Sequence, residues 1–209
     1  MFNRSLETIL LTIPAIIIGF SFHEFAHAFA SNKLGDPTPR NQGRLTLSPL
    51  AHIDIIGFIL ILVAGFGWAK PVQINPRYYK NPRRDEMIVS LAGPAMNLVV
   101  AFVFVVIYRL TINFYSGDNV VVYNLLRVIE YVTWINVILF FFNLIPLPPL
   151  DGFHILKELM PRRQYRLVWF LEQYSTIILL IIIITPVMSY VILPPATFIN
   201  DLFFRLLGM

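Results

Sequence analysis

The sequence predicts an all-α polytopic membrane protein with about four full transmembrane helices and one short re-entrant or interfacial segment. Of its 209 residues, 57% are hydrophobic and 13% are charged. An average soluble domain is about 45–50% apolar and about 25% charged. Four apolar runs also reach the roughly 20 residues that a helix needs to cross a bilayer. We therefore expect one integral-membrane domain over residues 1–209, with its core at about 8–157.

The four apolar runs are expected to cross the membrane as helices. Three prolines after the third run must end that helix, because proline lacks an N–H and clashes with the preceding turn. Pro186 interrupts the fourth run, and residues 194–209 can lie at the interface as an amphipathic piece. The predicted spans are residues 8–31, 87–108, 125–144 and, as the last helix, about 167–193.

Residues 53–66 are apolar but too few to cross, so we predict that they enter the membrane and return on the same side. Most lysines and arginines then collect on one face of the bilayer. These are Lys33, Arg40, Arg44, Lys70, Arg77, Lys80, Arg83, Arg84, Lys157, Arg162, Arg163 and Arg166. Basic loops stay in the cytoplasm. The first and third spans would then bring their polar ends to one depth, toward the cytoplasmic side of what we expect to be a prokaryotic cell membrane.

Two short stretches, residues 45–47 and 72–75, alternate between apolar and polar residues and are possible short β-strands. We favour an ordinary hairpin that closes the re-entrant segment. The alternative is a free strand edge that binds an extended substrate, since an unwound membrane helix needs hydrogen-bond partners.

Composition also limits the partners. The chain has no cysteine, so disulfides and thiolate metal sites are excluded and any zinc must use histidine and carboxylate. The net charge of +4 does not indicate nucleic-acid binding, because bilayer orientation explains the basic loops. The partners expected are the lipid bilayer and membrane-protein substrates; nothing in the sequence indicates an oligomeric state.

The first apolar run contains the motif HEFAH, in which His23, Glu24 and His27 are the only residues between 9 and 30 that can carry a charge. Histidines four apart share one helix face and can bind one zinc ion, and the glutamate can take a proton from a zinc-bound water. An ionised group at membrane depth costs about 2.5–3.5 kcal/mol on insertion scales, so these residues indicate a function.

Two other interpretations of this motif stay open at this stage. A histidine pair on a helix can form hydrogen bonds without any metal. Residues 1–30 also resemble a signal peptide, with Arg4 before an apolar stretch and a small-residue site at Ala28-Phe29-Ala30. The apolar stretch is longer than a signal peptide usually has, so we favour a metal site.

A catalytic zinc needs a third protein ligand and an open position. The candidates are Asp36, Asp54, Glu172 and Asp151. We favour Asp151, because the prolines before it force the chain out of helix and can deliver a carboxylate inward while the backbone stays buried. The alternative role for Asp151 is a helix N-cap.

Three signatures in order, HEFAH at 23–27, AGPAMN at 92–97 and NLIPLPPLDG at 143–152, resemble those of the site-2 protease family of intramembrane zinc metalloproteases. The stretches GRLTLSPLAHID at 43–54 and GWAKPV at 67–72 resemble its compact prokaryotic branch, without a PDZ or CBS domain. The likeness covers about residues 15–157. Phe153 and His154 depart from the residues expected after the Asp-Gly pair.

The resemblance implies one Zn²⁺ per chain, with His23, His27 and Asp151 as ligands and Glu24 as catalytic acid/base. It implies regulated intramembrane proteolysis, the hydrolysis of peptide bonds in or near transmembrane segments, by a single metalloprotease domain.

The resemblance also implies that Asn143 lies near the substrate or the oxyanion and that Gly93, Pro94 and Asn97 take part in helix packing at the site. Asn97 is a second candidate near the substrate or the oxyanion. A helix cap would explain Asn143 equally well, and helix packing would explain Asn97.

Two further histidines are candidates for residues that contact the metal ligands or the substrate without binding the metal. His52 could orient a ligand, but we favour an ordinary polar residue at the interface, and His154 could face the substrate. The competing functions are a metal transporter or other non-proteolytic zinc-binding membrane protein, and an inactive relative. A transporter does not need a general base at Glu24.

Overall fold

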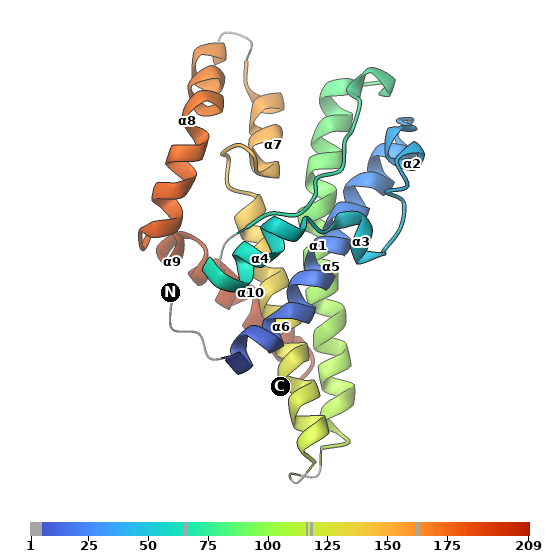
Figure 1. Cartoon of the computed structure of the whole chain (residues 1–209), viewed down its shortest axis with the longest axis vertical. Helices are drawn as coiled ribbons and strands as arrows, with labels where there is room; N and C mark the ends of the chain where they lie inside the picture. The colour runs from blue at the N-terminus through green and yellow to red at the C-terminus, as the bar shows by residue number, and fades with distance from the viewer. Residues whose placement is uncertain (1–5, 65–66, 116, 118, 162–163) are drawn as a thin grey trace.

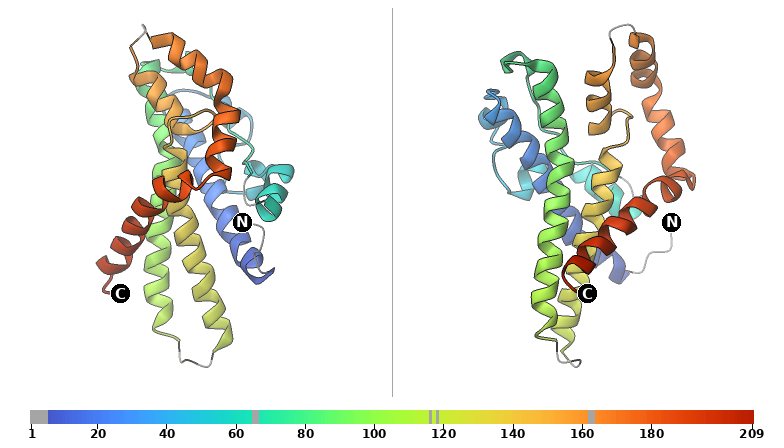
Figure 2. Two further views of the ribbon diagram at one scale, coloured as in Figure 1. Left: turned by 90° about the vertical axis from the view of Figure 1, so that its left-hand side faces the viewer. Right: turned by 180° about the vertical axis from the view of Figure 1, so that it is seen from behind.

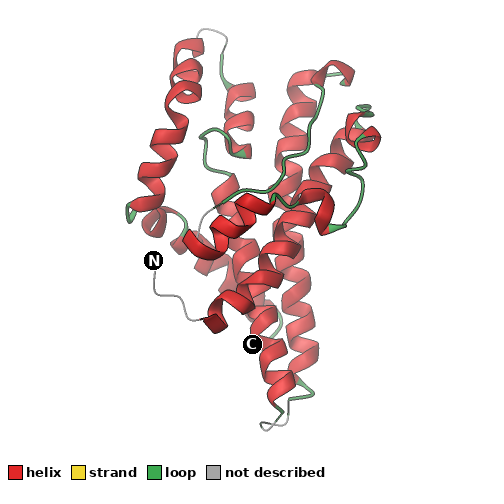
Figure 3. Cartoon of the chain, viewed as in Figure 1, coloured by secondary structure: helices red, strands yellow, loops and turns green. Residues whose placement is uncertain are grey.

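The computed structural model describes residues 6–64, 67–115, 117, 119–161 and 164–209, and these residues form helices and loops without a β-strand (Figure 3). Within that part of the chain, four helices are long and apolar enough to cross a membrane. They are α1 Leu6–Lys33, α5 Pro82–Ile112, α6 Val120–Asn143 and α8 Tyr165–Ile184 (Figure 1). The predicted fold class, an all-α polytopic membrane protein, is confirmed.

Helices α1, α5 and α6 form the centre of the molecule. They meet at Ala15, Val100 and Val132, all at most 5% exposed. Small and β-branched residues let helices approach closely where no hydrophobic effect drives them together. A second cluster, around Ala101 and Ala196, attaches α10 Leu193–Leu206 to α5 and α6.

Local sequence explains where these long helices begin. The carboxylate of Asp85 accepts a hydrogen bond from the Asn81 N–H, just before Pro82 opens α5. Asn119 caps α6, because its side-chain oxygen accepts the N–H groups of the two residues at 121 and 122. Free N–H groups at a helix start need such acceptors.

The short apolar segment after His52 folds back on itself, and its re-entrant or interfacial position in the membrane stays a prediction. Helix α4 Ile55–Ala64 has 10 residues and is about 15 Å long at 1.5 Å per residue. The two ends of the segment meet, since Ile53 pairs with Ala69 and the Lys70 N–H donates to the His52 carbonyl at 2.8 Å. The two ends of the segment therefore lie side by side, which is the geometry that a re-entrant or interfacial segment requires.

The two predicted short strands are wrong. Residues 45 and 46 form a bend, and residues 71–75 have no regular secondary structure and no ladder partner. Ile53 and Ala69 pair instead and close the segment. Short helices precede and follow this segment in the chain: α2 Thr38–Asn41, α3 Pro49–His52 and the 3₁₀ helix η1 Pro76–Tyr78.

The last predicted span is shorter than expected. Helix α8 ends at Ile184, and Pro186 separates it from α9 Val187–Val191. Helix α7 Asp151–Leu159 precedes α8, and the two lie at one edge of the molecule (Figures 1 and 2). An ion pair of 3.1 Å between Lys157 and Glu172 joins them.

Candidate metal centre

The predicted histidine pair and glutamate lie on the buried face of α1. His23, Glu24 and His27 are 7%, 8% and 9% exposed. The Nε2 atoms of His23 and His27 are 3.0 Å apart, as expected for two histidines one helical turn apart.

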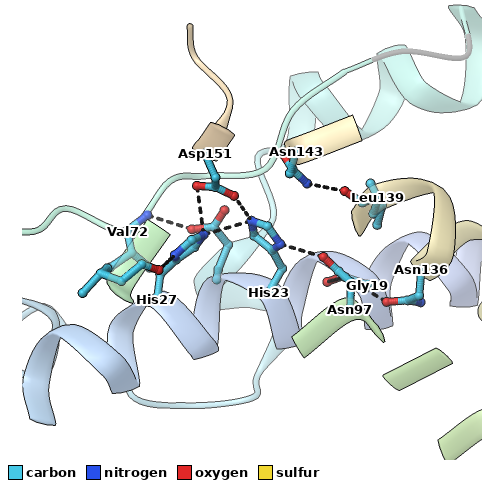
Figure 4. A network of polar contacts seen from close by, with 11 residues as sticks. Gly19, His23, His27, Val72, Asn97, Asn136, Leu139, Asn143 and Asp151 are labelled. Atoms are coloured by element: carbon cyan, nitrogen blue, oxygen red, sulfur yellow. Dashed lines mark hydrogen bonds and ion pairs between the residues drawn. The ribbon is translucent and has the colours of Figure 1, made fainter. Parts of the chain in front are cut away.

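Asp151 reaches the same point from the other end of the chain. Helix α6 ends at Asn143, the prolines carry the chain round, and α7 begins with Asp151 itself. Gly152 permits this turn, because a Cβ there would lie 2.2 Å from the Leu144 carbonyl oxygen. The Asp151 carboxylate oxygens then lie 3.2 Å from His23 Nε2 and 3.3 Å from His27 Nε2 (Figure 4).

A chain of buried amides fixes the tautomer of His23. The Val132 carbonyl can only accept, so Asn136 must turn its Nδ2 toward it, at 2.8 Å, and its Oδ1 toward Asn97. Asn97 Nδ2 donates to that Oδ1 at 2.9 Å and to the Gly19 carbonyl at 3.2 Å. Asn97 Oδ1 therefore accepts from His23 Nδ1, at 2.7 Å, which must carry the proton.

The same reasoning applies to the second histidine. His27 Nδ1 donates to the Val89 carbonyl at 2.8 Å. In a neutral imidazole the other nitrogen is then an acceptor, so both Nε2 atoms present lone pairs. Two lone-pair nitrogens thus face a carboxylate, and Asp151 Oδ2 is buried without a hydrogen-bond donor among the described residues.

Such a cluster of acceptors needs a cation. Three potential ligand atoms, from His23, His27 and Asp151, lie within 4.8 Å of one another. A tetrahedral zinc with ligands at about 2.0–2.1 Å separates neighbouring ligand atoms by about 3.3 Å. The observed 3.0–3.3 Å separations fit this value. These residues therefore fit zinc, with a position left open for water.

Helix α5 supplies the floor of the site at Gly93. A Cβ there would lie 2.3 Å from His27 Nε2 and 2.7 Å from His23 Cε1. No side chain can occupy this position while both imidazoles keep their places. Gly93 therefore has a role in the site itself, beyond the helix packing that the resemblance implied.

Glu24 lies beside the ligand cluster and is held by backbone. The N–H of Val72 donates to Glu24 Oε2 at 2.9 Å (Figure 4). The other carboxylate oxygen accepts no hydrogen bond from the described residues, so it remains available to a water molecule.

The structure places the other predicted residues differently. Asn97 lies behind His23, completely buried, and does not face a substrate. Asn143 lies at the end of α6, with Nδ2 bonded to the Leu139 carbonyl at 3.0 Å (Figure 4). His154 is exposed on α7. His52 is completely buried rather than interfacial, and donates to the Thr46 carbonyl at 2.7 Å.

The three carboxylates that competed with Asp151 have other partners. Asp54 caps α4 through the Gly57 N–H at 2.9 Å. Asp36 accepts hydrogen bonds from Ser31, Thr38 and Asn75. Glu172 pairs with Lys157 on the exposed edge of the molecule.

Sequence reasoning missed Asn136 and the Val72 amide. Asn136 lies two helical turns before Asn143 in an apolar span, and a buried amide in such a span is itself an indication of function. No sequence pattern identifies a single backbone N–H as the partner of Glu24.

Four apolar helices, three of which pack together at a His-His-Asp cluster, define a polytopic membrane protein with a candidate metal centre. Comparisons with known proteins identify its family. The model of peptidase family M50 matches residues 109–185. The protein named "Putative zinc metalloprotease YwhC" from Bacillus subtilis is 42% identical over 184 residues, covering 87% of this chain and 84% of its own. "Putative zinc metalloprotease Rip2" from Mycolicibacterium smegmatis is 29% identical, covering 86% and 69%.

A third relative is archaeal. A protein of Methanocaldococcus jannaschii, also named as a putative zinc metalloprotease, is 32% identical over 156 residues, covering 74% of this chain and 73% of its own. No solved structure matches the chain significantly. The chain belongs to peptidase family M50, the site-2 protease family.

Proposed function

We propose that this chain is an intramembrane zinc endopeptidase, in which His23, His27 and Asp151 hold one zinc ion and Glu24 is the catalytic acid/base. The observation that carries the proposal is the meeting of two lone-pair nitrogens and an unpartnered carboxylate beside Glu24, inside an apolar helix bundle. The metalloprotease names of its relatives support it. We propose one metalloprotease domain over residues 1–209.

Each residue of the site has a separate role in the proposed reaction. A zinc ion, when bound, supplies a Lewis acid that lowers the pKa of water toward about 7 and polarises a carbonyl. Glu24, held at Oε2, takes the proton of the attacking water on its other oxygen and returns it to the leaving amine. Asn143 Nδ2 keeps a second proton, which makes it the candidate donor to the oxyanion.

The test compares zinc content with cleavage of a membrane-embedded model substrate. We expect wild type to hold one zinc and to cleave, His23→Ala to lose the zinc, and Glu24→Gln to keep it while cleavage falls by about 10²–10⁴-fold. Cleavage by Glu24→Gln at the wild-type rate would contradict the proposal. Membership of a peptidase family does not favour the transporter alternative.

We further propose that the site opens toward the cytoplasm. Helix α2 and the starts of α5 and α8, which carry Arg40, Arg83, Arg84 and Arg166, lie at one end of the molecule, and the α5–α6 connection lies at the other (Figure 1). Because the chain has no cysteine, single cysteines can report the two sides. An impermeant thiol reagent added to intact cells should label Phe114→Cys and not Arg40→Cys; the reverse pattern would contradict this orientation.

The substrates we propose are membrane proteins that present an extended segment to the site. Residues 71–75 form no helix, and the Gln73 N–H has no hydrogen-bond partner among the described residues. If this edge receives the substrate, Gln73→Pro should lower turnover while zinc stays bound. Unchanged turnover would exclude the edge and leave the segment a purely structural role.

A further inference from the structure

We infer that Arg44 is a positioning residue for Glu24: its guanidinium and the Glu24 carboxylate hold opposite ends of one peptide group, Pro71–Val72. The inference rests on the proposed function, because it assigns Arg44 a part in placing the catalytic acid/base. Arg44 touches neither the histidines nor Asp151 through any hydrogen bond among the described residues.

Arg44 is buried in an unusual way. It is 7% exposed, and all its hydrogen-bond acceptors among the described residues are backbone carbonyls rather than carboxylates. Nη1 donates to Ala51 and, at 3.2 Å, to Lys70, while Nη2 donates to Pro71 at 3.2 Å. A buried cation is normally paired with an acid. Here the planar guanidinium joins the end of α3 to the chain that follows the short apolar segment.

The decisive contact lies at the Pro71 carbonyl. The Pro71 C=O and the Val72 N–H belong to the same planar peptide group, and this bond is trans, so its two polar atoms point in opposite directions. Arg44 binds the oxygen at 3.2 Å, and Glu24 Oε2 binds the N–H at 2.9 Å. The peptide group is therefore a rigid link between a buried cation and the catalytic carboxylate.

This link has two consequences for the reaction. It fixes the rotation of the Glu24 carboxylate by holding Oε2 at the loop, and it leaves the other oxygen free to take a proton. A carbonyl bound to a cation also makes its own N–H a stronger donor, because hydrogen bonds in a chain polarise one another. Without the link, Glu24 can turn away from the water while the zinc ligands stay in place.

The test is a double-mutant cycle on the full-length protein. Arg44→Lys keeps the charge but loses the planar fork, and Val72→Pro removes the single N–H that Glu24 accepts. Each variant should lower kcat by about 10–100-fold with zinc content and KM unchanged, the size expected when a catalytic group is displaced by about 1 Å. The double variant should be no slower than the slower single variant, because both changes break the same link.

Two controls separate this role from a general effect on folding. Val72→Ala keeps the N–H and should therefore retain much more kcat than Val72→Pro does. Gln42→Ala removes the exposed 3.1 Å contact between Gln42 and Gln73, which holds the same stretch of chain, and should keep wild-type kcat. If Arg44→Lys does not fold, the comparison of Val72→Pro with Val72→Ala still decides whether the link positions Glu24.

The outcomes distinguish this inference from the proposed function. If wild type fails to cleave, or Glu24→Gln cleaves, the proposed function is wrong. If wild type and Glu24→Gln behave as expected, three results would still contradict the positioning role of Arg44. Arg44→Lys could keep wild-type kcat, or the losses of kcat in Arg44→Lys and Val72→Pro could multiply in the double variant. The third result is an equal kcat for Val72→Pro and Val72→Ala.

Discussion

Helices α1 and α8 are almost equally apolar but have opposite surroundings. The mean hydropathies of their apolar stretches are 1.8 and 2.1. Half of the apolar stretch of α1 is buried in the protein, but only 11% of the apolar stretch of α8 is buried. Helix α1 carries the histidines and contacts α5 and α6, whereas α8 packs mainly on its continuation α9. Hydropathy therefore identifies a membrane span, and the polar and small residues within it decide whether protein or lipid surrounds it.

The largest expected effect follows from adding one methyl group to the floor of the site. Gly93→Ala should abolish zinc binding and cleavage, because the new Cβ would lie 2.3 Å from His27 Nε2. Alanine favours a helix by about 1 kcal/mol over glycine, so α5 itself should not be weakened. Metal analysis of purified protein measures the effect, with the exposed Ala95→Leu as a control that keeps zinc. Full zinc content in Gly93→Ala would show that the imidazoles are not held as described.

The next effect separates the buried amide network from simple packing. Asn136→Leu removes the acceptor that orients Asn97, and should weaken zinc binding about 10–100-fold. Asn136→Asp, protonated in its buried site, keeps both the acceptor and a donor to Val132 and should bind zinc nearly as wild type does. Competition with a chelator measures both affinities. Equal affinities for the two variants would mean that the network does not orient His23.

A smaller effect concerns the loops beside α1. Burial raises the pKa of Asp36, but the hydrogen bonds it accepts from Thr38, Asn75 and Ser31 outweigh burial and hold its pKa below the ordinary value. Because the folded pKa is depressed, the stabilisation is complete above about pH 4, the unfolded value, and is lost as the pH falls through the folded pKa.

Asp36→Asn should therefore lower stability at pH 7 by about 1–3 kcal/mol, and the difference from wild type should shrink below about pH 4. Thermal unfolding in detergent measures this, in a His23→Ala background so that metal loss does not contribute. A difference that stays constant down to acidic pH would show that Asp36 is not ionised in the folded protein.

The smallest expected effect lies in α8. Ile177 is 59% exposed on this helix, so Ile177→Ala should change stability by less than about 0.5 kcal/mol. Val132→Ala, in the completely buried contact of α6 with α1 and α5, should cost about 1–2 kcal/mol. Unfolding of the two variants in the same detergent compares them. Equal losses would mean that α8 packs against the protein as tightly as the central helices do.

The sequence was sufficient for the fold class, the four spans and the meeting of His23, His27 and Asp151. Each followed from a strong signal: apolar length, or a charge-capable group in an apolar run. The expected strands at 45–47 and 72–75 did not form, because alternation alone does not supply a neighbouring strand to bond with. The Arg44 and Val72 contacts depend on where a loop crosses the site, which only tertiary structure determines.

The central claim is that His23, His27 and Asp151 hold one metal ion, and X-ray absorption at the zinc edge tests it most directly. Wild type should contain about one zinc per chain with nitrogen and oxygen ligands at about 2.0–2.2 Å and no sulfur. Asp151→Ala should lose the zinc or bind it much more weakly. A zinc site in Asp151→Ala with unchanged affinity and spectrum would contradict the account.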